Sequence, residues 1–150
     1  MKNLTDFINE ASNRERFFMG ATSRRTQSNF KFNAGEKVIL IKYDTDGYEA
    51  QLRGVYEIDK VGKNSIKLKG DEYTAAKKFD AYGICVERNK NAYRGNSTLY
   101  WVLYNADLVD DNDIVQLIEK GTNSWGFHSE KRNTPAFAAE LKEYIDELHK

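Results

Sequence analysis

Apolar and polar residues alternate along the central part of the chain, which is the pattern of half-buried strands. Residues 65–69 show it most clearly, with Ile66 and Leu68 directed to one side and two lysines to the other. Turn-forming residues, such as those at 44–47, separate one segment from the next. The predicted strands cover residues 36–43, 48–61, 65–69, 82–88 and 98–104. Short strands divided by turns are typical of a small antiparallel barrel.

Apolar residues at helical spacing flank this strand-rich centre. The predicted helices cover residues 3–12, residues from about 110 to Gly121, and residues from Pro135 to about Leu148, with one further helical turn at 73–76. A polar arm follows the first helix and ends at residue 29. The chain is therefore predicted to be an α+β protein, with its helices at the two ends and its strands between them.

A glycine-acid pair opens the first predicted strand, at Gly35-Glu36-Lys37-Val38. Arg53-Gly54-Val55 with Ile58 follows in the second strand, and Ile66-Lys67-Leu68-Lys69-Gly70 closes the third. Together these residues resemble the KOW-type, SH3-like barrel. The resemblance implies an SH3-like antiparallel barrel of about five strands over residues 30–105. An N-terminal helix with a basic arm (1–29) would precede it, and a C-terminal helical extension (106–150) would pack on it.

KOW-type domains occur in ribosomal proteins and transcription elongation factors, where they bind RNA, DNA or RNA polymerase. The first ten residues are also similar to the openings of many small tailed-phage proteins. Phages encode a MotB-like family of KOW-containing, DNA-binding modifiers of transcription, and this chain resembles that family. The resemblance implies nucleic acid as the partner, with RNA polymerase or another host protein as a further partner.

Charge is unevenly distributed, although the total is zero. Residues 1–105 carry 18 Lys and Arg against 13 Asp and Glu, whereas residues 106–150 carry 5 against 10. Basic side chains that share a surface bind phosphates by releasing counterions, so the first part is the expected nucleic-acid side. The candidate contact residues are Arg24, Arg25, Lys60, Lys63, Lys67, Lys69, Lys77, Lys78, Arg88, Lys90, Tyr93 and Arg94. Tyr93 is expected to stack on a base. The alternative is that outward lysines only solvate the barrel and protect its edge.

Catalytic and metal chemistry have little support in the sequence. His128 has Ser124 and Ser129 nearby, but no nucleophile elbow surrounds them. The aspartates at 107–113 lack the glycine and terminal glutamate of a calcium loop, so a role at a helix start is predicted instead. Cys85 lies in an apolar strand and is expected to be a buried, inert thiol. We therefore expect a protein that is not an enzyme and that uses no cofactor and no metal.

The function expected from the sequence is non-catalytic nucleic-acid binding, in a small phage-type modulator of transcription or chromosome organisation. The sequence has no long apolar run, so a cytoplasmic protein without membrane contact is expected. The alternative is a protein-binding inhibitor or adaptor that acts on a host enzyme, which the many aromatic residues and the acidic C-terminal helices favour. In that case Trp125 and Phe127 would form an exposed anchor, although a place in the core is the preferred prediction.

Overall fold

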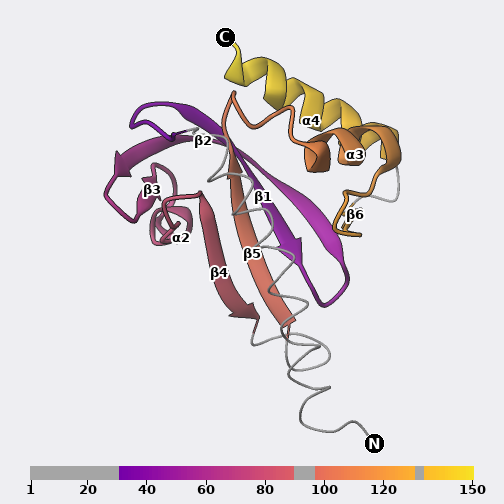
Figure 1. Ribbon diagram of the computed structural model, residues 1–150, viewed down its shortest axis with the longest axis horizontal. Coiled ribbons are helices and arrows are strands. Elements are labelled where there is room, and N and C mark those ends of the chain that lie inside the picture. Colours follow the sequence, from indigo (N-terminus) through magenta and orange to yellow (C-terminus); the bar gives the residue numbers. More distant parts are fainter. Residues whose placement is uncertain (1–30, 90–96, 131–133) are drawn as a thin grey trace, which may run out of the picture. The chain divides into compact units, whose positions relative to one another are not determined.

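Five antiparallel strands curl into a half-barrel at the centre of the structure, which is a computed structural model (Figure 1). It describes residues 31–89, 97–130 and 134–150. The described elements are β1 (Lys37–Asp44), β2 (Glu49–Val61), β3 (Ile66–Leu68), α2 (Glu72–Ala75), β4 (Ile84–Asn89), β5 (Ser97–Tyr104), α3 (Asn112–Lys120), β6 (His128–Ser129) and α4 (Thr134–Leu148). The strands and the C-terminal helices belong to one compact unit, Phe32–Lys150.

The strand order is β3-β2-β1-β5-β4, and β6 pairs in parallel with the start of β2. From β1 to β5, consecutive strands are neighbours except β3 and β4, between which the chain forms α2. The two edge strands, β3 and β4, are not paired, so the half-barrel is open between them. An isolated bridge joins Ile66 of β3 to Phe79, which precedes β4. The predicted mixed α+β fold with an antiparallel, barrel-like sheet is therefore confirmed at this level.

A β-bulge in β2 changes the register of the sheet between Leu40 and Ile41 of β1. Leu40 pairs with Gly54 and Ile41 pairs with Leu52, so Arg53 is the extra residue. Gly54 has a φ of +126°, a backbone conformation that residues other than glycine rarely adopt. The bulge leaves Arg53 exposed beside the ring of Trp101 on β5.

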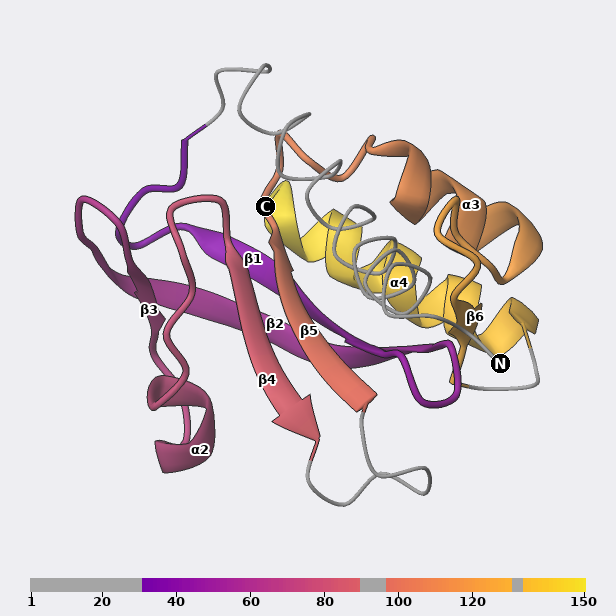
Figure 2. The same ribbon diagram turned by 60° about the horizontal axis from the view of Figure 1, so that its bottom comes forward.

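Helices α3 and α4 cover one face of the sheet, which we call the helix-covered face (Figure 2). Alternation along β1 places Ile39, Ile41 and Tyr43 on this face, and all three are buried. The ring of Tyr43 packs against Trp125 and Phe127 at centroid distances of 5.3 and 5.2 Å. The aromatic pair that follows α3 therefore belongs to the core, as preferred from the sequence.

The other face lies inside the curl, and we call it the inner face. Leu40 of β1 and Leu103 of β5 are buried there, opposite one another in the ladder. Ile58 and Leu68 extend this core across β2 and β3, and Phe79 closes it at the opening of the half-barrel. Trp101 is on the same face as Leu103 and is only 2% exposed, as predicted for a ring that lies mid-strand between the apolar residues Tyr100 and Val102.

The observed strands begin and end within two residues of the predicted ones. The helical turn expected near residue 73 is α2, and the expected stop at Gly121 is a left-handed cap with a φ of +70°. Strand β6 was not predicted, because two residues carry no periodic signal. The helix expected over residues 3–12 lies outside the described residues.

Candidate nucleic-acid interface

Three lysines from separate chain segments form a row on the outer surface of the half-barrel. Lys60 of β2 and Lys67 of β3 are direct partners across the antiparallel ladder. Ile66 and Phe79 exchange two backbone hydrogen bonds of 2.9 and 3.2 Å, so the antiparallel register brings Lys78 opposite Lys67. Ile66 and Phe79 are buried, and the exposed lysines next to them therefore point outward. We call Lys60, Lys67 and Lys78 the lysine row.

An open groove lies beside the lysine row, with a volume of about 510 Å³. Its lining residues are Ala34, Asp59, Lys60, Val61, Gly62, Ser65 and Lys67. Asp59 is the extra residue of a second register shift in β2, and it is the only acidic group of this lining. The lining therefore includes two basic residues and one acidic residue.

The remaining basic candidates differ in how available they are to a ligand. Lys63 is exposed in the turn between β2 and β3. Lys69 is exposed but forms an ion pair of 2.8 Å with Glu57, whose carboxylate raises the pKa of the lysine. Arg88 is exposed on β4, opposite Thr98 and at the other end of the strand order. Arg24, Arg25, Lys90, Tyr93 and Arg94 lie outside the described residues.

Lys77 is a correction to the predicted surface set. Its side chain is only 3% exposed, and its ammonium forms an ion pair of 2.8 Å with Glu87 of β4. The same nitrogen lies 3.8 Å from the ring centroid of Trp101 and 4.0 Å from that of Tyr73. An ammonium enclosed by two rings and a carboxylate is not available to phosphate, so Lys77 is part of the interior.

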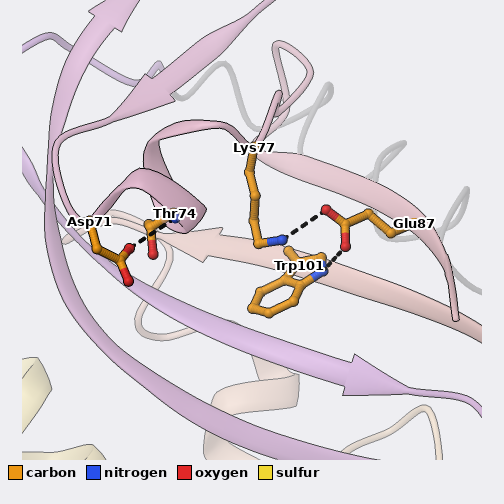
Figure 3. Close-up of polar contacts among 5 residues, drawn as sticks. All are labelled: Asp71, Thr74, Lys77, Glu87 and Trp101. Carbon is orange, nitrogen blue, oxygen red and sulfur yellow. Dashed lines mark hydrogen bonds and ion pairs between the residues drawn. The ribbon is translucent and has the colours of Figure 1, made fainter. Parts of the chain in front are cut away.

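We call the group that results, Tyr73, Lys77, Glu87 and Trp101, the Trp101 cluster; Figure 3 shows its last three members. Lys77 and Glu87 point toward one another beside the indole ring, and the second carboxylate oxygen of Glu87 accepts a hydrogen bond of 3.2 Å from Trp101 Nε1 (Figure 3). Asp71 caps α2, because its carboxylate accepts a hydrogen bond of 2.9 Å from the backbone amide of Thr74. The cap thus stabilises the helical turn that carries Tyr73, and the ammonium lies over the Tyr73 ring, whose side chain remains largely exposed.

The aspartates near α3 and the single cysteine, which the sequence offered as candidates for metal or thiol chemistry, lie in surroundings that indicate a structural role. Asp113 is fully buried in the first turn of α3 and accepts a hydrogen bond from Ser124, whereas Asp111 occupies the N-cap without a side-chain capping bond. Burial raises the pKa of the Cys85 thiol. Among the described residues, no three histidine, cysteine or acidic side chains are arranged to hold a metal ion.

The lysine row could not be found from sequence spacing, because its members come from three segments. Phe79 was the available signal: a single large apolar residue in a polar stretch indicates a buried anchor and therefore an outward neighbour. Comparisons of this chain with protein-family models, with curated proteins and with solved structures find no match. None of the helices in the described part of the chain has the length and apolar character needed to cross a membrane.

Proposed function

We propose that this protein binds nucleic acid without catalysis, holding backbone phosphates along the lysine row. The observation that carries the proposal is the direct pairing of Lys60 with Lys67, with Lys78 next in line. Like charges placed directly opposite one another in a sheet destabilise it. None of the three lysines forms an ion pair with another described residue, so a bound polyanion would supply the missing counter-charge.

The spacing of the row suits a phosphate chain. Adjacent strands lie about 4.8 Å apart, so three lysines in line span about 10 Å. Lys63 in the adjoining turn extends the basic surface beyond the groove. Contacts of this kind fix the position of a nucleic acid but carry little sequence information. The proposed activity is therefore backbone binding, which suits a modulator of transcription or chromosome organisation.

We further infer that the half-barrel is a KOW-type, SH3-like domain. Its Gly-Glu pair joins the start of β1 to β2: the Gly35 amide donates to Ile58 O at 2.8 Å, and the Ile58 amide donates to Glu36 O at 2.9 Å. Gly35 has a φ of +85°, which explains why a glycine opens the pattern. Gly54 lies at the bulge. The residues of the motif thus occupy backbone positions on which the curl depends.

The test is a titration of a fluorescent duplex at several salt concentrations, followed by anisotropy. Three contacts to a duplex give an expected slope of log K against log salt of about −2.7. Changing Lys60, Lys67 and Lys78 together to Glu should flatten this slope and weaken binding to all sequences alike. A matched control changes Lys120, Lys142 and Lys150 to Glu, because these lysines are also exposed but lie on or after the C-terminal helices. Equal losses in the two triple variants would refute a defined phosphate face.

The alternative function, that of a protein-binding inhibitor or adaptor acting on a host enzyme, now has less support. Its suggested anchor, Trp125 and Phe127, is buried, with exposures of 6% and 3%. The acidic C-terminal helices remain as its motivating feature. A wild-type protein that binds neither duplex nor single strand at low salt would favour this alternative.

A further inference from the structure

The Trp101 cluster holds an exposed aromatic ring in a fixed position. Tyr73 is 58% exposed, and its ring meets the buried Trp101 edge-on at a centroid distance of 6.1 Å. The Lys77 ammonium lies over the Tyr73 ring. Asp71 caps the helical turn that carries this ring by accepting a hydrogen bond from the Thr74 amide (Figure 3). An aromatic ring that is already immobilised loses little conformational entropy when a ligand stacks on it.

Further cations surround the same indole ring. Lys42 Nζ lies 5.4 Å from the Trp101 centroid, and Arg53 Cζ lies 5.8 Å from it. Arg53 is exposed and Lys42 is partly exposed, so both can contact a ligand. Lys77 differs from them, because its charge is already matched by Glu87. The open end of the inner face therefore combines one exposed ring with two accessible cations.

We propose that this end of the inner face binds an unpaired base of a single-stranded nucleic acid, which stacks on the outer side of Tyr73 while Arg53 and Lys42 hold the adjoining phosphate. This proposal rests on the proposed function and deepens it, because it separates a single-strand subsite from the phosphate-binding row. Base stacking on aromatic side chains is tolerant of sequence, and Arg and Lys supply the backbone contacts that accompany it.

The chemistry of the cluster favours a nucleotide over an apolar peptide side chain. An apolar group laid on Tyr73 would remove water from the neighbouring guanidinium of Arg53 without pairing its charge, which is unfavourable. A nucleotide instead has a flat face for the ring and an anion for the guanidinium. A paired base cannot reach the ring, because its faces are covered within the duplex stack. The subsite should therefore distinguish single strands from duplexes.

The experiment compares a fluorescein-labelled oligothymidine of about 12 nucleotides, within the usual site size for one small barrel, with a duplex of equal length. Tyr73→Ala should weaken binding of the single strand roughly 5- to 150-fold, the range that corresponds to one lost stacking contact. Binding of the duplex should change by less than about twofold, because backbone contacts dominate there. Tyr73→Phe should keep single-strand affinity, since the ring remains.

Three controls make the result decisive. Tyr48→Ala removes another exposed tyrosine, 51% exposed in the turn before β2, and should not change single-strand affinity. Tyr73→Ala should leave the salt slope unchanged, whereas the lysine-row triple variant should flatten it for both probes. The urea midpoint of each variant verifies that it is folded.

The proposed subsite and the proposed function fail in different ways. If Tyr73→Ala binds the single strand as tightly as the wild type while the lysine-row variant loses binding, the subsite is refuted and phosphate binding stands. If the wild type prefers the duplex, or if Tyr48→Ala causes an equal loss, the subsite is also refuted. Absence of any binding at low salt overturns both proposals.

Discussion

On the helix-covered face, Tyr43 and Tyr104 are completely buried, and their hydroxyl groups share a hydrogen bond of 2.8 Å. On the inner face, the aromatic residues are instead in contact with charged groups: Trp101 is buried beside the Lys77–Glu87 ion pair, and Tyr73 next to it is exposed. Both faces are rich in rings. On the first, two buried hydroxyl groups pair with one another near the buried Asp113, whereas on the second the rings contact an ion pair whose carboxylate, that of Glu87, is partly exposed.

This difference indicates which aromatic residues serve stability alone. A ring enclosed by apolar neighbours, such as Phe127, has no route to a ligand without unfolding. A ring that borders ionised groups at the surface keeps part of its area available to a ligand. Removing those ions partly from water costs free energy, and a role in ligand binding would explain why they are there. Changes on the helix-covered face should therefore affect unfolding alone, whereas changes around Trp101 should affect unfolding and binding together.

The largest effects are expected from truncating one large ring on each face. Phe127→Ala and Trp101→Ala should each lower the free energy of unfolding by about 3–5 kcal/mol, because each removes a buried aromatic side chain. Urea denaturation followed by far-UV circular dichroism measures both. At a temperature where both variants are folded, only Trp101→Ala should lose single-strand affinity. A loss of stability below about 1 kcal/mol for Trp101→Ala would contradict its burial.

A smaller effect is expected from removing the carboxylate of the Trp101 cluster. Glu87→Gln takes away the counter-ion of the buried Lys77 ammonium and should cost about 2 kcal/mol. This is less than the loss for a fully buried ion pair, because the Glu87 side chain is 35% exposed. The double variant Lys77→Met/Glu87→Gln should recover part of the loss, since it no longer buries an unmatched charge. If the double variant is less stable than Glu87→Gln, the ion pair is not the source of the effect.

Next comes the hydroxyl pair of the helix-covered face. Tyr43→Phe removes the hydrogen bond to Tyr104 and should cost about 1 kcal/mol in urea denaturation at neutral pH. Burial raises the pKa of the Tyr43 phenol well above 10, and the nearby Tyr104 and Asp113 add to the effect. The folded protein then holds the phenol proton more tightly than the unfolded chain does.

The sign of the pH dependence follows from this difference. The contribution of Tyr43 to stability is complete below its unfolded pKa of about 10 and is lost as the pH rises from there toward the folded pKa. The unfolding free energy of the wild type should therefore fall more steeply above pH 10 than that of Tyr43→Phe. Equal slopes for the two proteins would contradict a buried neutral phenol at this position.

The sequence predicted most of the strands, because alternation and turn residues are local signals. It also predicted that Trp101 would be buried, since apolar residues flank it on both sides. The environment of Lys77 could not be predicted, because it depends on Trp101 and Glu87, which are distant in the chain. The same reason explains the lysine row: Lys78 joins Lys67 only through the bridge between Phe79 and Ile66. The local pattern of apolar and polar residues thus predicted the strands and helices. Pairing between segments distant in the sequence determined which lysines are exposed to a ligand.

The smallest effect concerns the cap that positions Tyr73, at the exposed end of the inner face. Hydrogen bonds from Thr74, from its side chain first and then its backbone amide, lower the pKa of Asp71 below its ordinary value of 3.8. The cap should therefore be intact above pH 4 and be lost only as the pH falls through the lowered pKa of the folded state. This acid sensitivity is the opposite of the alkaline sensitivity expected of Tyr43.

The change in unfolding free energy from this exposed cap is too small to resolve in urea, so a local probe is needed. The chemical shift of the Thr74 amide in a ¹⁵N-resolved NMR titration should follow Asp71 with a midpoint below 3.8, because that amide donates to the carboxylate at 2.9 Å. Asp71→Asn should abolish this titration and still cap α2, since Asn and Asp are comparable N-cap residues. Asp71→Ala should abolish both, and it should reduce single-strand affinity without changing duplex affinity, because Tyr73 is then no longer fixed. A Thr74 midpoint at or above the ordinary aspartate value, or unchanged single-strand affinity in Asp71→Ala, would show that the cap does not position Tyr73.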